Sequence, residues 1–94
     1  MSGAIQTTES ITNYRWLLFI WKTNAEYVSE LLPAFSNMVA HKSISAGAWD
    51  STNNRFAYNA WCDVVFSGTT GATVTSGYNN PNFQMGIYEI WGIG

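Results

Sequence analysis

Residues 55–67 constrain the fold more than any other segment, because their sequence, RFAYNAWCDVVFS, alternates with a period of two. Successive side chains of a β-strand point to opposite sides of a sheet, so this period predicts a strand with one face in the core. The other face carries Ala57, Asn59, Trp61, Asp63 and Val65. The predicted core face consists of Phe56, Tyr58, Ala60, Cys62, Val64 and Phe66.

Residues 13–22, NYRWLLFIWK, predict a second strand that is apolar on both faces. A strand without a polar face is central in its sheet. One face can enter the core of a sandwich, and the other needs a second cover that a partner subunit could provide. The two faces are Tyr14, Trp16, Leu18 and Ile20 against Leu17, Phe19 and Trp21.

Residues 23–39, TNAEYVSELLPAFSNMV, give two conflicting signals. Several apolar residues fall near helical spacing, and Thr23 with Glu26 resembles a helix capping box. Pro33 opposes a helix, because its ring clashes with the preceding turn and drives Leu32 toward extended geometry. We therefore expect at most one short helical turn, followed by an extended stretch over 31–36.

The segment 83–94, FQMGIYEIWGIG, predicts the final strand. Together with shorter strands expected at 42–50 and 72–77, the chain has about six strands, separated by polar turns. This pattern predicts one all-β domain over residues 1–94, a small antiparallel β-sandwich, with residues 1–5 poorly ordered. Alternation places on one face of the final strand Met85, Ile87, Glu89, Trp91 and Ile93.

One cysteine and one histidine limit how a chain of 94 residues can gain stability. A domain this short buries a modest share of its surface, so disulfides, metals or partner subunits usually add to it. Cys62 alone cannot form an intramolecular disulfide, and with His41 it does not supply the closely spaced ligand pairs of a structural zinc site. We therefore expect partner subunits and no metal or other cofactor.

Charge and hydropathy argue against further classes of protein. Only 11% of the residues are charged, against about 25% in ordinary domains, so much of the surface must be uncharged or covered by copies of the chain. A net charge of -2 with four scattered basic residues argues against a nucleic-acid partner. No apolar run reaches the roughly 20 residues of a membrane helix, and the N-terminal sequence lacks a secretory signal. We expect neither membrane insertion nor export by the chain's own signal.

The series ESITNYRWLLFIWK, LLPAFSN, YNAWCDVVFSGTTGATVTSG and MGIYEIWGIG resembles the C-terminal domain of bacteriophage tail fibre and tail receptor-binding proteins. The resemblance spans about Gln6 to the last residue and departs from the family at Trp91, where a tyrosine is common. It implies a trimeric β-sandwich at the distal tip of a virion's tail fibre that touches the host cell surface, without a fixed set of ligand residues. It rests on Ser10, Ile11, Asn13, Tyr14, Pro33, Phe35, Ile87, Tyr88, Ile90, Trp91, Gly92 and Ile93.

The apolar final strand has two explanations. In a homotrimer of this kind, neighbouring subunits would cover Ile90, Trp91 and Ile93 at a subunit interface. Alternatively, the strand lies in the core of its own monomer. The family resemblance favours the trimer.

The sequence gives little support to catalysis. Nothing around His41 suggests a nucleophile elbow, and Cys62 alternates with apolar neighbours as a buried small residue would. Asp63 and Glu89 interrupt apolar faces and are the best candidates for a glycan hydrolase, although a cross-strand or intersubunit polar contact explains them more simply. We therefore predict that the chain is not an enzyme.

Two turns carry the residues that saccharides need, which are planar amides and carboxylates beside aromatic rings. Turns favour the same residue types for local reasons, so this signal is weak. The strand tryptophans Trp16, Trp21, Trp61 and Trp91 are expected in the core or in interfaces instead. The candidate ligand residues are Trp49, Asp50, Asn53, Asn54 and Arg55 in the first turn and Tyr78, Asn79, Asn80 and Asn82 in the second.

Three functions fit these observations. The leading hypothesis is a non-enzymatic tail-fibre domain that trimerises and binds a host surface receptor, a saccharide or another outer-surface molecule. The second is a free-standing oligomeric lectin or toxin-like β-sandwich. The third is a small hydrolase that uses Asp63 or Glu89.

Overall fold

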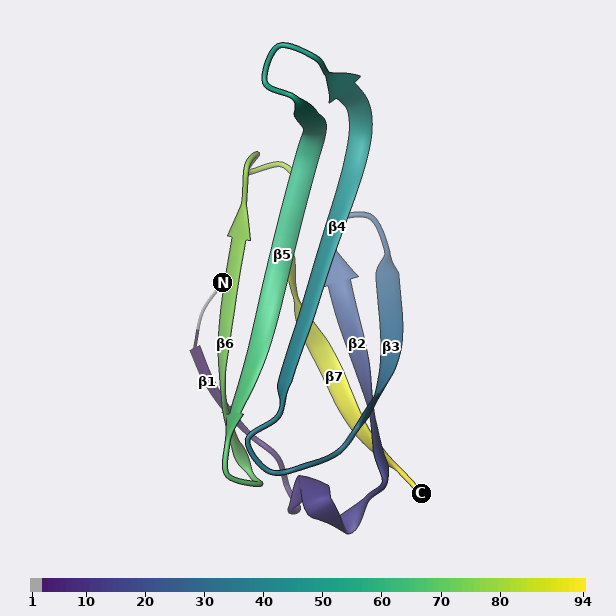
Figure 1. Cartoon of the computed structure of the whole chain (residues 1–94), viewed down its shortest axis with the longest axis vertical. Helices are drawn as coiled ribbons and strands as arrows, with labels where there is room; N and C mark the ends of the chain where they lie inside the picture. The colour runs from purple at the N-terminus through teal and green to yellow at the C-terminus, as the bar shows by residue number, and fades with distance from the viewer. Residues whose placement is uncertain (1–2) are drawn as a thin grey trace.

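The fold is a sandwich of two antiparallel sheets, seen in a computed structural model that describes residues 3–94, without the side chains of Asp50 and Arg55 (Figure 1). One sheet has the strand order β1-β6-β5-β4 and the other β3-β2-β7. The elements are β1 (Gly3–Gln6), a 3-10 turn η1 (Ile11–Asn13), β2 (Trp16–Thr23), β3 (Tyr27–Pro33), β4 (Val39–Asp50), β5 (Arg55–Ser67), β6 (Gly71–Tyr78) and β7 (Met85–Ile93). The predicted all-β sandwich is confirmed, with seven strands.

The strand beyond the expected six is β1. It covers Gly3–Gln6 and so overlaps the segment 1–5 for which poor order was expected, and Ile5 pairs with Ala72 of β6 and packs against the core. Pairing with β6 and the apolar contact of Ile5 hold residues 3–6 in place. Residues 1–2 lie outside the described part of the chain.

The core contains most of the face that the alternation of β5 predicts, but Phe56, predicted on that face, is 42% exposed near the hairpin tip. The even-numbered residues of β5 from Ala60 to Phe66 are buried in one cluster with Leu17, Phe19 and Trp21 of β2. The rings of Phe19 and Trp21 stack with their centroids 5.7 Å apart. β2 is the central strand of its sheet, as its two apolar faces predict.

The expected helical turn after β2 is a β-hairpin instead. The Thr23 N–H donates to the Glu26 carbonyl (2.9 Å), and Thr23 Oγ1 accepts from the N–H groups of Ala25 (3.2 Å) and Glu26 (3.0 Å). The Thr–Glu pair that resembles a capping box therefore closes a turn. Residues at apparent helical spacing form β3, an edge strand on which Pro33 is tolerated.

A β-bulge in β7 makes the predicted face of the last strand wrong. Ile20 pairs with Glu89, but the next residue, Trp21, pairs with Ile87, so Tyr88 is an extra residue. The bulge reverses the alternation. Before it Met85 and Ile87 face the core, and after it the residues facing outward are Glu89, Trp91 and Ile93.

The β4–β5 hairpin is longer than expected and extends beyond the second sheet (Figure 1). β4 covers Val39–Asp50, against an expected 42–50. Its register shifts between Ala46 and Trp49, where Gly47 has φ of 82°, a left-handed conformation that favours glycine. The turn of this hairpin and the C-terminus consequently lie at opposite ends of the molecule.

Candidate functional site

The outer surface of the β3-β2-β7 sheet is mainly apolar, although its Ser29–Ile20–Glu89 row is polar at both edges, and we call it the apolar face. Two rows of paired residues cross it: Leu31–Leu18–Trp91 and Pro33–Trp16–Ile93. Trp16, Leu31, Trp91 and Ile93 are all exposed. Single exposed apolar residues are normal, whereas a contiguous group across three strands indicates an interaction surface.

The structure divides the predicted interface residues between two environments. Trp91 and Ile93 lie on the apolar face. Ile90 points the other way and packs against the core, because neighbouring residues of a strand face opposite sides. A partner on the apolar face would therefore contact Trp91 and Ile93.

Near the turn end of β2, the apolar face carries one cation and one anion. The Lys22 ammonium lies 5.5 Å from the ring centroid of Tyr27 and 5.7 Å from that of Tyr88. Glu89 Oε1 accepts a long hydrogen bond from Trp91 Nε1 (3.4 Å). The formal charges of Lys22 and Glu89 offset one another on this surface.

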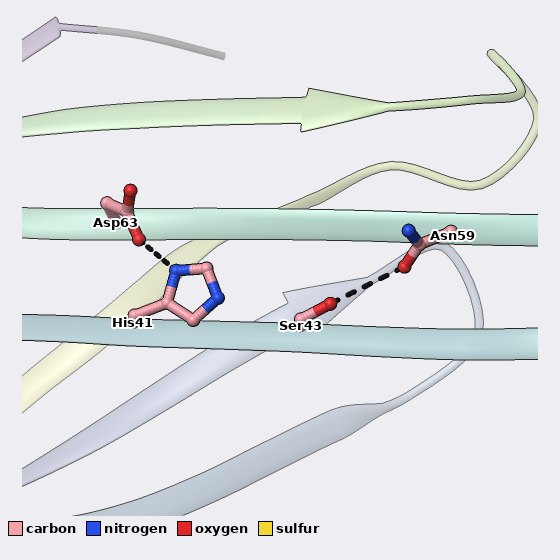
Figure 2. Close-up of polar contacts among 4 residues, drawn as sticks. All are labelled: His41, Ser43, Asn59 and Asp63. Carbon is pink, nitrogen blue, oxygen red and sulfur yellow. Dashed lines mark hydrogen bonds and ion pairs between the residues drawn. The ribbon is translucent and has the colours of Figure 1, made fainter.

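The outer surface of β4 and β5 is different in character, and we call it the polar strip (Figure 2). His41 Nδ1 pairs with Asp63 Oδ1 across the two strands. The Ser43 and Ser45 hydroxyls each donate to Asn59 Oδ1, at 3.4 and 3.3 Å. The polar strip consists of His41, Ser43, Ser45, Asn59, Trp61 and Asp63.

Trp61 lies in the middle of the polar strip, paired with Ser43 on one side and Gly77 of β6 on the other. A Cβ built on Gly77 would lie 2.6 Å from three atoms of the Trp61 indole. Three equal distances mean that the ring lies flat over the Gly77 backbone. The half-buried indole is therefore not part of the core, which is one of the two places expected for the strand tryptophans; the other, an interface, stays a prediction.

The first predicted ligand turn lies at the tip of the β4–β5 hairpin. Trp49 is 54% exposed and meets Phe56 edge to face, with the ring centroids 5.2 Å apart. Asn53 and Asn54 are exposed in the turn, and Asn54 has a left-handed φ of 54°. The predicted Asp50 and Arg55 side chains lie outside the described part of the structure.

The second predicted turn has mainly structural bonds. The Asn59 N–H donates to Asn79 Oδ1 (2.7 Å), and Asn79 Nδ2 donates to the carbonyls of Phe56 (3.4 Å) and Ala57 (3.5 Å). These bonds join the turn to β5 close to the hairpin tip. Asn79 thus satisfies backbone groups of β5 and has little capacity left for a ligand.

Another asparagine of the second turn bonds within the turn itself. Asn80 Oδ1 accepts from the N–H of Asn82 (2.9 Å), which is an Asx-turn. Tyr78 and Asn82 are exposed. The structure therefore brings the two predicted turns to one end of the molecule, where Trp49, Tyr78 and Asn82 remain accessible.

The carboxylates considered for hydrolysis do not form a pair. Asp63 lies on the outer surface of one sheet and Glu89 on the outer surface of the other, so the whole sandwich separates them. Glycosidases need two carboxyl groups within about 10 Å. Cys62 is buried in the core, as predicted, and burial raises the pKa of its thiol.

A cleft of about 570 Å³ lies between residues 5–14 and β7. Its wall includes Glu9, Tyr14 and Trp91, and the Tyr14 hydroxyl donates to Glu9 Oε2 (2.5 Å). Trp91 belongs both to the wall of the cleft and to the apolar face. The cleft is therefore not independent of the apolar face.

The residues that the structure describes contain neither a metal-binding cluster nor a membrane-spanning helix. No group of three or more His, Cys, Asp or Glu side chains among them could hold a metal ion. None of their helices is long and apolar enough to cross a membrane.

No protein-family model matches this chain, and no curated protein or solved structure does so either. The candidate surfaces therefore rest on the chain's own geometry. Sequence reasoning did not select Ser43, Asn59 or Trp61 as site residues. Their signal was the polar side of the strand alternation in residues 55–67.

Proposed function

We propose that this chain is a non-enzymatic receptor-binding domain of the kind found at the distal end of phage tail fibres. It assembles as a homotrimer through the apolar face and attaches the virion to a saccharide of the host cell surface. The observation that carries the proposal is the contiguous apolar face, with Trp91, Leu31 and Trp16 exposed on adjacent strands. Its removal from water would contribute about 25 cal/mol per Å² of apolar surface.

A copy of the same chain fits this face better than a strongly charged partner. The face offers one cation, Lys22, and one anion, Glu89, beside many apolar atoms. Interfaces are depleted of charge at their centre and enriched in aromatic residues, as this surface is. Three copies, the number that the family resemblance implies, would close a ring and cover every apolar face.

Assembly is tested with two variants, each of which adds one positive charge to the edge strand of a different sheet. Leu31, 49% exposed on the edge strand β3, is replaced by lysine, and the control is Val39→Lys, at a 56% exposed aliphatic position on the edge strand β4. We expect sedimentation velocity at micromolar concentration to show dissociation of Leu31→Lys alone, because a buried unpaired charge is costly. Equal masses for both variants and the wild type would contradict an interface on the apolar face.

Attachment is tested with fluorescently labelled protein and intact bacteria. We expect binding to some strains, with loss of binding to mutants that lack the surface polysaccharide. Unchanged binding to such mutants would point to a protein receptor. A trimer that binds no strain would retain only a capping role in the fibre.

A further inference from the structure

The polar strip has the chemistry of a carbohydrate platform. Its central indole lies flat on Gly77, so one ring face contacts the sheet and the opposite face is directed away from it. The C–H groups of a sugar pack well on such an aromatic surface. In the strand register, Trp61 pairs with Ser43, and His41 and Asn59 lie two residues away from this pair on β4 and β5.

The hydrogen-bonding capacity of the polar strip is only partly used. Asn59 Oδ1 accepts two long bonds from Ser43 and Ser45, and its amide nitrogen makes no hydrogen bond within the described part of the chain. The pairing of His41 Nδ1 with Asp63 leaves Nε2 on the other side of the ring (Figure 2). Sugar hydroxyls both donate and accept, so they suit this mixture of groups.

The charge of the polar strip selects among saccharides. Its two ionisable side chains, His41 and Asp63, pair with one another and leave no unpaired cation on the strip. Anionic polysaccharides are usually bound through Arg or Lys, because these side chains supply charge-assisted hydrogen bonds. A neutral polysaccharide does not need such a cation.

We propose that the polar strip binds a neutral polysaccharide, with one sugar ring stacked on Trp61 and its hydroxyls bonded to Asn59 and Ser43. This inference rests on the saccharide-binding part of the proposed function and moves the contact from the hairpin tip to the sheet. It does not depend on the trimer, because the polar strip lies on the opposite side of the sandwich from the apolar face.

The test is affinity electrophoresis in native gels that contain one polysaccharide each. Dextran, mannan and galactan are the neutral probes, and alginate is the anionic probe. We expect at least one neutral gel to retard the wild-type protein and alginate to leave it unaffected. Retardation by alginate alone, or by none of the four, overturns the inference.

Three variants locate the contact. Trp61→Ala should weaken binding by at least about tenfold, since it removes the stacking surface. Asn59→Ala should weaken it as well, and covers the case in which Trp61→Ala does not fold. Trp49→Ala, at the hairpin tip, should bind as the wild type does. Full retardation of Asn59→Ala together with a loss in Trp49→Ala would place the contact at the tip and overturn the inference.

The mass of the same samples separates this inference from the assembly proposal. A trimer that no gel retards would overturn saccharide binding by the strip and leave the apolar interface standing. A monomer that a neutral gel retards would support saccharide binding by the strip and overturn the apolar interface.

Discussion

The indole of Trp61 lies flat on Gly77, in a space that any larger residue at position 77 would fill. A Cβ there would be 2.6 Å from three indole atoms, whereas a Cβ on Gly71, in the same strand, would have no atom within 4 Å. Glycine at position 77 therefore lets the large aromatic ring lie along the sheet. This is one reason why a weak strand former occurs inside β6.

Gly77→Ala should consequently destabilise the protein, by about 1–3 kcal/mol, the usual cost of forced overpacking. Gly71→Ala is the matched control and should change stability by less than about 0.5 kcal/mol. Urea denaturation followed by tryptophan fluorescence measures both. Equal stability of the two variants would show that the ring moves aside without cost.

Asn79 should be important for stability, although sequence reasoning proposed it as a ligand residue. Asn79→Ala leaves the Asn59 N–H, now bonded at 2.7 Å, without its acceptor. The expected loss is about 1–3 kcal/mol, the cost of an unsatisfied polar group. Asn82→Ala, at an exposed position in the same turn, should lose much less. Thermal unfolding of the pair measures the difference, and a reversed order would contradict the role given to Asn79.

The free energy of unfolding should fall at alkaline pH as Tyr14 ionises. The hydrogen bond to Glu9, with desolvation and the charge of Glu9 as smaller causes, raises the pKa of Tyr14 above its ordinary value of 10.0. Folding thus favours the protonated phenol. The contribution of the Tyr14–Glu9 hydrogen bond to stability is therefore complete below pH 10 and is lost as the pH rises through the folded-state pKa of Tyr14.

The Tyr14→Phe variant isolates that effect. The difference in melting temperature between wild type and variant should be constant from pH 7 to pH 9 and should shrink above pH 10. Glu9→Gln keeps a hydrogen-bond acceptor for Tyr14 but removes the charge. Its melting temperature should therefore depend less on alkaline pH than that of the wild type. A difference that stays constant across the whole range would mean that the bond to Glu9 is not maintained in solution.

The sequence predicted the parts of the fold that depend on one strand at a time. The alternation of residues 55–67 predicted which side of β5 is buried, and the two apolar faces of β2 predicted its central position. The bulge at Tyr88 could not be predicted in this way, because an extra residue is defined only by its pairing with the neighbouring strand. Thr23 and Glu26 failed as a helix signal because the same side-chain bonds also close a hairpin turn.

The candidate site was predicted less well than the fold. Turn composition selected the hairpin tip, where Trp49 is accessible, but it also selected Asn79, which bonds the backbone of β5. Trp61 was assigned to the core or an interface because alternation does not reveal what covers the outer side of a sheet. Its place above Gly77 follows from the β5–β6 register, which a single strand does not contain.

The central claim is that copies of this chain cover the apolar face, and the most direct measurement is the mass in solution by sedimentation equilibrium. Trp91 on that face is 53% exposed and Trp49 at the hairpin tip is 54% exposed, so alanine at either position removes a similarly exposed ring. We predict a wild-type mass of three 10.5 kDa chains. Trp49→Ala should keep this mass, and Trp91→Ala should dissociate, since buried aromatic anchors contribute about 2 kcal/mol or more to interfaces. A monomeric wild-type protein, or a trimer that Trp91→Ala leaves intact, would contradict the claim.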